Sequence, residues 1–306
     1  MSNPTEPLRG IWPALLTPLH ADLSIDDAVF AEHARALIAA GCPGVTPFGT
    51  TGEGPSFSLA ERRAAIDALA ARGVAPAQML VSTSCAALPE AIELTRHATT
   101  LGAWGCLVMP PFFLKGVSDE GVIDFYARLI DSVADARLRL MLYHIPQVSG
   151  VGLSHAVIAE LLRHYPATIV GIKDSGCQIA PSLALAEAFM PPIVVHVGNE
   201  LDLPALGQRG STGAVSGLAN FMPRLVHRLV LEADTARAAA DLQRVQRLLA
   251  WLGGYSLTPA LKGIMAARSG QRSWLRVRPP LVALSDTAFD KLAAELRTHP
   301  IDLTND

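Results

Sequence analysis

The chain contains the apolar run Thr168-Ile169-Val170-Gly171-Ile172-Lys173-Asp174-Ser175-Gly176, which ends in charged and polar residues. A short apolar run bounded by turn residues predicts a buried strand, and Lys173 lies close to its C-terminal end. Amphipathic segments that predict helices lie on either side, at Ser154–Tyr165 and Pro181–Phe189. Strands that alternate with helices in this way are the units from which parallel sheets are built.

The same alternation continues along most of the chain. Eight apolar runs predict strands: Gly10–Leu16, Gly44–Phe48, Met79–Thr83, Gly105–Met109, Leu138–Ile145, Ile169–Lys173, Ile193–Val197 and Gly213–Gly217. The helices predicted between them include Asp26–Ala40, Ser58–Arg72, Pro89–Leu101 and Asp119–Ala134. Eight such units predict an α/β fold of the closed (β/α)₈ barrel type. A doubly wound open sheet is the alternative, but no GxGxxG motif follows the first strand.

Two helix starts carry recognisable capping residues. Ser24 is the predicted cap of the first helix, and Ser58 with Glu61 forms a predicted capping box.

The end of the chain has a different pattern. From residue 223 onward only helices are predicted, at Pro223–Ala233, Arg237–Leu252, Pro259–Ser269 and Asp286–Arg297. We therefore expect two parts, a barrel at 1–222 and a C-terminal helical domain at 223–306.

Composition excludes several classes of function. Half of the 306 residues are hydrophobic, and the formal net charge is −3. There is no basic stripe, long apolar segment or signal peptide, so we expect no nucleic-acid partner, no membrane span and a cytoplasmic location. The four cysteines form no CxxC pair and the nine histidines no HExxH motif. We therefore expect neither a metal nor another cofactor.

Lys173 is an unusual residue in this setting, because only four of the 25 basic residues are lysines. Burial disfavours the charged form of an amine, and a neutral amine is the nucleophile of Schiff-base enzymes. The alternative is a strand-end lysine that reaches solvent or pairs with Asp174.

Two further features are predicted at the same face of the barrel. The loop after the second predicted strand is Gly49-Thr50-Thr51-Gly52-Glu53-Gly54, whose amides and hydroxyls could hold an anion such as a carboxylate. The alternative is a glycine loop that requires positive φ angles.

Tyr143 ends the fifth predicted strand, and its phenol could move a proton to or from a substrate oxygen. The alternative is a tyrosine at the edge of the core, hydrogen-bonded to the backbone. Thirty residues, about one strand–helix unit, separate Tyr143 from Lys173, which predicts neighbouring strands. Nucleophile, proton shuttle and anion cradle together suit Schiff-base chemistry on a 2-oxo acid.

These motifs resemble the dihydrodipicolinate synthase/N-acetylneuraminate lyase family from about Gly10 to the C-terminus. The matching motifs are GTTGE at Gly49–Glu53, Tyr-x-x-Pro at Tyr143–Pro146 and Gly-x-Lys-Asp-Ser at Gly171–Ser175. The resemblance implies a homotetramer, a dimer of dimers, acting on a small-molecule 2-oxo acid. It implies that Lys173 forms the Schiff base.

Further site roles follow from the same resemblance. Tyr143 would be the general acid/base, and Thr50 would relay its protons. Thr51 and the loop amides of Gly49 and Gly52 would hold the substrate carboxylate.

Two departures from the family pattern narrow the expected function, the first through the substrate and the second through the proton relay. The synthases have an arginine two residues after Tyr-x-x-Pro, for the carboxylate of the aldehyde substrate, and this chain has Val148. Many members have a tyrosine that reaches a neighbouring subunit, and this chain has Phe113.

Two weaker candidates follow the later strands. Glu200 is a candidate contact for substrate hydroxyls, or else a solvated loop carboxylate. Ser216 is a small polar contact or a space-filler at the end of the eighth predicted strand.

The sequence therefore predicts a carbon–carbon or carbon–oxygen lyase of the class I aldolase type. The reaction would be cleavage of a 2-keto-3-deoxy acid to pyruvate and an aldehyde, or its dehydration. One alternative is 4-hydroxy-tetrahydrodipicolinate (dihydrodipicolinate) synthase, which condenses pyruvate with aspartate semialdehyde. Another is a non-catalytic protein that binds 2-oxo acids. The aldehyde half of the substrate and the choice between aldolase and dehydratase stay open.

Overall fold

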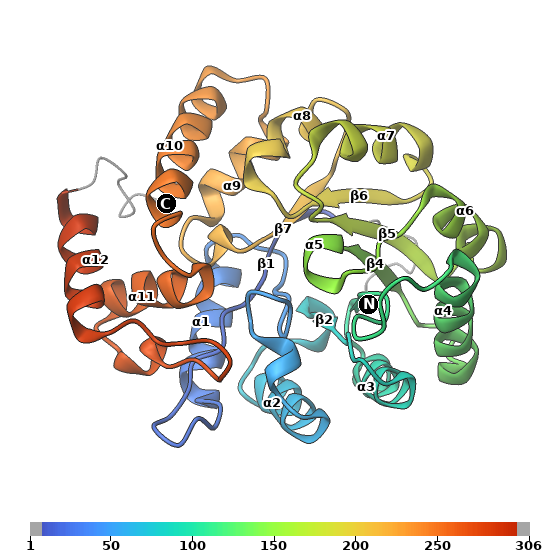
Figure 1. Ribbon diagram of the computed structural model, residues 1–306, viewed down its shortest axis with the longest axis horizontal. Helices are drawn as coiled ribbons and strands as arrows, with labels where there is room; N and C mark the ends of the chain where they lie inside the picture. Colours follow the sequence, from blue (N-terminus) through green and yellow to red (C-terminus); the bar gives the residue numbers. More distant parts are fainter. Residues whose placement is uncertain (1–7, 299–306) are drawn as a thin grey trace.

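The structure is a computed structural model, and it describes residues 8–298. Within these residues one parallel sheet curves around the centre of the molecule, with helices outside it (Figure 1). The order of its strands is β1-β7-β6-β5-β4-β3-β2. The strands are β1 (Gly10–Pro13), β2 (Leu80–Ser82), β3 (Gly105–Val108), β4 (Leu140–His144), β5 (Ile169–Asp174), β6 (Val194–Val197) and β7 (Gly213–Ser216).

The segment Gly44–Phe48 occupies the eighth position of the barrel without forming a full strand. It joins β1 and β2 through parallel bridges of Thr46 with Ala14 and of Val45 with Met79. The pairing is short because Pro47 has no N–H to donate and Phe48 has a φ of 62°. The (β/α)₈ architecture is confirmed, and the strand predicted at 44–48 is a bridging segment.

Helices surround this sheet in the predicted order. They are α1 (Asp27–Ala39), α2 (Leu59–Ala71), α3 (Leu88–Leu101), α4 (Asp119–Val133), α5 (Pro146–Ser149), α6 (His155–His164), α7 (Ile179–Phe189), α8 (Leu203–Gly207), α9 (Pro223–Leu231), α10 (Ala236–Leu252), α11 (Leu257–Ser269) and α12 (Asp286–Thr298). The capping box of α2 is confirmed, since the Ser58 side chain accepts from the Glu61 N–H and the Glu61 carboxylate accepts from the Ser58 N–H.

The predicted cap of α1 is wrong. Asp26, not Ser24, caps this helix, and its carboxylate accepts a hydrogen bond from the Val29 N–H at 3.1 Å. Ser24 instead donates to Asp22 within a turn that precedes the helix.

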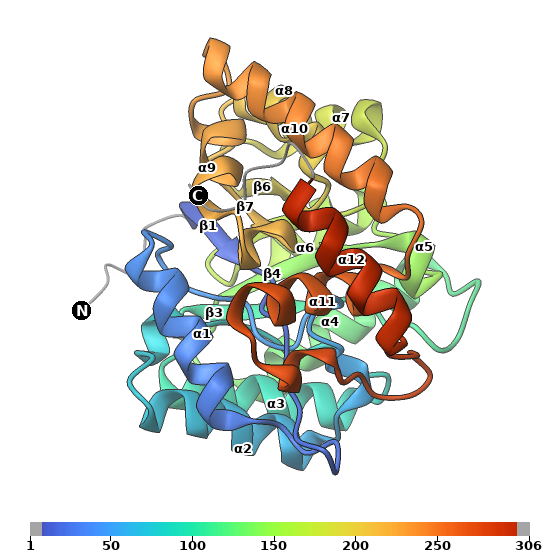
Figure 2. The same cartoon turned by 90° about the vertical axis from the view of Figure 1, so that its left-hand side faces the viewer.

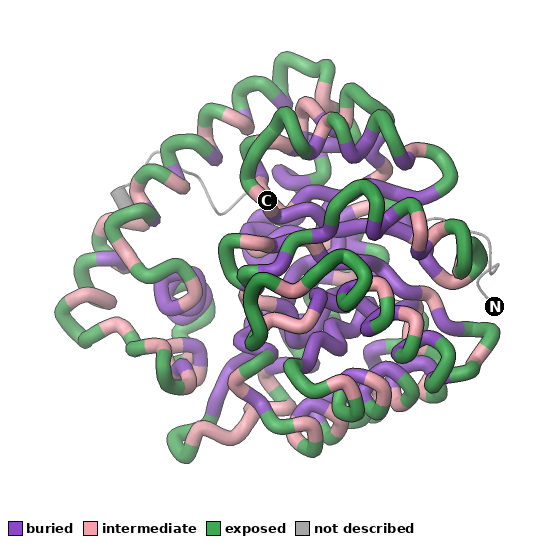
Figure 3. Tube along the Cα trace, turned by 45° about the vertical axis from the view of Figure 1, so that its right-hand side comes forward, coloured by how far each residue is buried: buried purple, intermediate pink, exposed green. Residues whose placement is uncertain are grey.

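Two apolar cores lie on opposite sides of the strands. Figure 3 shows that the buried residues gather along the strands at the centre of the molecule. The larger core fills the space between strands and helices. The smaller core fills the barrel interior and includes Trp12, Met141, Tyr143 and Val215. Because successive residues of a strand face opposite sides, Leu142 and Ile172 belong to the outer core while Tyr143 belongs to the inner one.

The last helices extend beyond the barrel (Figure 2). Helix α9 packs against β1 and β7, and α11 packs against α12. The division of the chain at residue 222 stays a prediction. Among residues 8–298, no helix is long and apolar enough to cross a membrane.

Two histidines are buried in this fold. His33 Nε2 lies 3.0 Å from Asn220 Oδ1, and His196 Nε2 lies 3.3 Å from Thr212 Oγ1. Among residues 8–298, His196 Nδ1 has no hydrogen-bond partner. Desolvation lowers the pKa of His33 to about 4 and that of His196 to about 3.

Acid should therefore destabilise the protein through these two side chains. Below a pH of about 6.5 the unfolded chain binds protons that the folded chain excludes, so the free energy of unfolding falls as pH falls. Each histidine should lower the free energy of unfolding by about 1.4 kcal/mol for each unit of pH decrease, down to a pH near its pKa in the folded protein. Urea unfolding of His196→Leu between pH 7 and 5 should show a shallower fall than the parent protein. Equal slopes would contradict this assignment.

Candidate active site

Three side chains meet at the C-terminal end of the barrel strands. Tyr143 on β4 and Lys173 on β5 are register partners, as their spacing predicted. Lys173 Nζ donates to Tyr143 Oη at 3.3 Å, and Thr50 Oγ1 lies 3.2 Å from the same oxygen. One phenolic oxygen therefore connects the lysine to the threonine of the glycine-rich loop.

Lys173 is buried, and within residues 8–298 no carboxylate pairs with its Nζ. Only 4% of the residue is exposed, and Nζ lies 4.4 Å from the centroid of the Tyr143 ring. The Asp174 carboxylate accepts instead from Ser182 Oγ at 2.6 Å and from the Gly176 N–H at 2.8 Å. The alternative of a solvent-exposed or Asp174-paired lysine is wrong. The alternative for Tyr143, a hydroxyl bonded to backbone, is wrong as well.

Gly198, directly after β6, has no side chain, and Lys173 occupies the space where one would lie. A Cβ at this position would lie 2.9 Å from Lys173 Cε and 2.2 Å from Ser175 Oγ. Real Cβ atoms essentially never approach a heavy atom this closely, so a larger residue would displace the aliphatic part of the lysine.

Gly52 and Gly54 serve close packing rather than unusual backbone angles, whereas a Cβ at Gly49 would meet nothing within 4 Å. The positive φ angle in this loop belongs to Glu53, at 58°. A Cβ at Gly52 would lie 2.5 Å from the Leu15 carbonyl oxygen, and one at Gly54 would lie 1.9 Å from that of Phe48. The alternative that these glycines are needed for positive φ is wrong.

Hydrogen bonds inside the loop show which of its N–H groups donate to the loop's own carbonyls. The N–H groups of Gly52 and Gly54 both donate to the Gly49 carbonyl at 3.1 Å. The Glu53 N–H donates to the Thr50 carbonyl, also at 3.1 Å. Within residues 8–298, no such bond engages the N–H groups of Thr50 and Thr51. An anion at this loop would therefore meet the two threonines, while Gly49 and Gly52 shape the turn.

Glu200 and Ser216 bind one another. Ser216 Oγ donates to Glu200 Oε1 at 2.6 Å, and the Leu218 N–H donates to the same oxygen at 3.3 Å. Glu200 is 8% exposed and Ser216 is 1% exposed, so the interpretation of Glu200 as a solvated carboxylate is wrong. The pair fastens the end of β7 to the turn after β6. The adjacent Gly217 packs against Thr51, since a Cβ there would lie 3.3 Å from Thr51 Oγ1.

The structure contains a second buried lysine that was not predicted from the sequence. Lys262 on α11 is fully buried and donates to Glu53 Oε1 at 2.7 Å. The apolar residues around it, Pro259-Ala260-Leu261 and Ile264-Met265, were the available signal. Glu53 belongs to the loop that carries Thr50 and Thr51, so this ion pair lies directly behind the site.

The described residues contain no group of three or more His, Cys, Asp or Glu side chains that could hold a metal ion.

A parallel barrel with reactive side chains at the C-terminal ends of its strands has the organisation of a (β/α)₈ enzyme. The model of the dihydrodipicolinate synthetase family matches residues 7–299, and the chain belongs to that family. It is a lyase of the class I aldolase type, as the sequence predicted.

Curated relatives are similar along nearly the whole chain. A DapA-like lyase of Chloroflexus aurantiacus is 35% identical, over 94% of this chain and 95% of the relative. A 4-hydroxy-tetrahydrodipicolinate synthase of Rhizobium meliloti is 31% identical, over 94% of this chain and 97% of the relative.

Solved structures agree with this assignment. The dihydrodipicolinate synthase of Agrobacterium tumefaciens superposes with a TM-score of 0.88 at 29% identity, covering 95% of this chain and 99% of the other. YagE, a prophage protein of E. coli K12 crystallised with pyruvate, superposes with a TM-score of 0.85 at 26% identity, covering 95% and 98%.

Replacing Gly198 with alanine should impair the site without unfolding the protein. The added methyl group would move Lys173, and displacements of about 1 Å in an active site can reduce a rate by about 100-fold. We expect kcat to fall by about 10- to 100-fold, measured as pyruvate release. Gly121→Ala is the matched control, because its Cβ would meet nothing closer than Ser118 Oγ at 3.7 Å. Equal kcat values for the two variants would rule out this packing role.

Proposed function

We propose that Lys173 forms a Schiff base with pyruvate or with the C2 carbonyl of a 2-keto-3-deoxy acid. The observation that carries the proposal is the contact of the buried Lys173 Nζ with Tyr143 Oη at 3.3 Å. The same oxygen lies 3.2 Å from Thr50 Oγ1, which supplies a path for protons. The crystal structure of YagE with pyruvate gives independent support for a 2-oxo acid ligand.

The geometry suits the formation of the imine. The Lys173 amine attacks the C2 carbonyl carbon, and an amine proton moves to the carbonyl oxygen to give a carbinolamine. Tyr143 then gives its phenolic proton to the departing hydroxide, which leaves as water, and a protonated imine remains.

Bond cleavage uses the same two residues. The Tyr143 phenolate takes the proton of the C4 hydroxyl while the C3–C4 bond breaks, and its electron pair moves to the imine nitrogen. The aldehyde leaves, Tyr143 returns the proton to C3, and water releases pyruvate from Lys173. In the dehydration alternative a proton leaves C3 and hydroxide leaves C4.

In this proposal, the substrate carboxylate binds at the glycine-rich loop. Thr51 Oγ1 and the N–H groups of Thr50 and Thr51 would hold it. Gly49 and Gly52 would contribute through the shape of the turn. Ser216 and Glu200 act behind this contact, because they bind one another and fix the strand end beside Thr51.

The rim of the site favours an aldehyde without a carboxylate. Val148 is 54% exposed where the synthases of the family have an arginine, and an apolar side chain offers no charge to a second carboxylate. The Rhizobium meliloti relative nevertheless carries the synthase name, so 4-hydroxy-tetrahydrodipicolinate synthase is the second candidate. Consumption of aspartate semialdehyde together with pyruvate would favour it.

We also propose a cytoplasmic homotetramer, organised as a dimer of dimers. Phe113, Leu114 and Val148 are large apolar residues that are more than half exposed at the mouth of the site. Exposed apolar residues of this kind often mark contacts between subunits.

Substitution of the two central residues tests the mechanism. Lys173→Ala should abolish turnover and the borohydride-reduced pyruvate adduct, read by peptide mass spectrometry. Tyr143→Phe should lower kcat by about 10²- to 10⁴-fold, the usual effect of losing a positioned acid/base, while Lys173 stays available for trapping. Full activity of Lys173→Ala would disprove the mechanism. A parent protein that binds pyruvate without adduct formation or C3 proton exchange would be a non-catalytic binder.

A further inference from the structure

The loop that carries Thr50 and Thr51 is held from behind by the C-terminal helices. Its carboxylate, Glu53, is 4% exposed, and both its side chain and that of Lys262 are fully buried. Lys262 lies 209 residues later, on α11, and its Nζ donates to Glu53 Oε1 at 2.7 Å. Buried charges are costly unless they are paired, so each of these two groups requires the other.

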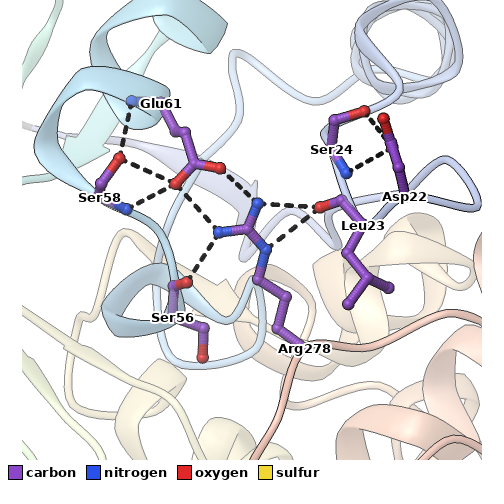
Figure 4. A network of polar contacts seen from close by, with 7 residues as sticks. All are labelled: Asp22, Leu23, Ser24, Ser56, Ser58, Glu61 and Arg278. Carbon is purple, nitrogen blue, oxygen red and sulfur yellow. Dashed lines mark hydrogen bonds and ion pairs between the residues drawn. The ribbon is translucent and has the colours of Figure 1, made fainter.

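The second carboxylate oxygen of Glu53 has its own partner. The Arg278 N–H donates to Glu53 Oε2 at 2.9 Å. The Arg278 guanidinium then donates to the carbonyls of Leu23 and Ser56 and to the Glu61 carboxylate, as Figure 4 shows. It also lies 4.4 Å from the centroid of the Phe57 ring. Arg278, in the segment after α11, therefore ties the C-terminal end of the loop, from Glu53 to Glu61, to the turn at Leu23.

The backbone transmits this anchoring to the site. Glu53 has a φ of 58°, a left-handed conformation that is unfavourable for a residue with a side chain. Its N–H donates to the Thr50 carbonyl at 3.1 Å, and its carbonyl accepts from the Ser56 N–H at 2.8 Å. A rotation of Glu53 would therefore move Thr50, whose Oγ1 lies 3.2 Å from Tyr143 Oη.

We propose that Lys262 is a positioning residue of the active site, which acts through Glu53 to hold Thr50 against Tyr143. The inference rests on the proposed function for its catalytic consequence. The chain of contacts starts at Lys262 and passes through Glu53 to Thr50. Thr50 contacts Tyr143, which contacts Lys173. A lysine outside the barrel therefore sets the geometry around Lys173 inside it. The C-terminal helices are then part of the catalytic apparatus.

Three variants and one control test the proposal in the full-length protein. Lys262→Met and Glu53→Gln each remove one charge, and the double variant removes both, so that neither charge is left unpaired. Asp241→Asn is the matched control. It breaks another buried ion pair, in which Arg228 Nε donates to Asp241 Oδ2 at 2.5 Å between α9 and α10, and neither residue belongs to the site.

The first readout is amide hydrogen exchange of the peptide covering residues 44–57, which needs no substrate. Exchange should rise by at least about 10-fold in Lys262→Met and in the double variant, because local opening becomes easier, and should be unchanged in Asp241→Asn. Unchanged exchange in the folded double variant would overturn the proposal, whatever reaction the protein catalyses.

The second readout separates positioning from stability. In the folded double variant, kcat and the rate of pyruvate C3 proton exchange should fall by about 10- to 100-fold. The fraction of Lys173 trapped by borohydride at long incubation should be retained. A kcat equal to that of Asp241→Asn would overturn the positioning role. Absence of any Lys173 adduct in the parent protein would instead overturn the proposed function, and hydrogen exchange would still decide whether Lys262 clamps the loop.

Discussion

The parallel pairing of β4 with β5 is the constraint on which the site depends. Tyr143 lies opposite Lys173 in this register, and both side chains face the barrel interior. Because side chains alternate along a strand, a slip of one residue would place Ile172 beside Tyr143 and turn the lysine toward the apolar shell of helices. The outer core contains Leu142 and Ile172, which hold this register by burying their side chains away from the mouth. Packing outside the barrel thus fixes the chemistry inside it.

Local patterns were sufficient to predict most of this arrangement. Apolar runs of strand length alternate with amphipathic helices, and a strand–helix unit of 30 residues places Tyr143 next to Lys173. The strand predicted at Gly44–Phe48 was less accurate, because a hydrophobic pattern does not take into account that Pro47 cannot donate a hydrogen bond. The Ser24 cap was wrong for a similar reason. Two cap-forming residues, Ser24 and Asp26, lie two positions apart, and only the path of the preceding turn selects between them.

Partners that lie far apart in the chain could not be inferred from local patterns. Glu53 and Lys262 are 209 residues apart, and only the packing of α11 behind the glycine-rich loop brings them together. Glu200 is a second example of a charged residue with a distant partner. A carboxylate in a loop suggests solvent exposure, but in the structure Ser216 Oγ donates to it at 2.6 Å. In both cases a charged residue in a turn is satisfied by a residue from another unit of the barrel or from the C-terminal helices. The sequence shows the charge but not the partner.

The two buried lysines have different surroundings, in agreement with the different roles proposed for them. Burial lowers the pKa of Lys262, and the Glu53 carboxylate at 2.7 Å opposes that shift, so this lysine is occupied by its ion pair. Among the residues that the structure describes, Lys173 has no carboxylate partner, and its Nζ donates to the phenolic oxygen of Tyr143 at 3.3 Å. A buried lysine paired with a carboxylate serves as a structural anchor, whereas the Schiff-base role proposed for Lys173 requires an amine that is not held in this way. The two lysines therefore differ in what faces each nitrogen. The loop at Gly49–Gly54 contacts Lys262 directly through Glu53, and through Thr50 it contacts Tyr143, the neighbour of Lys173.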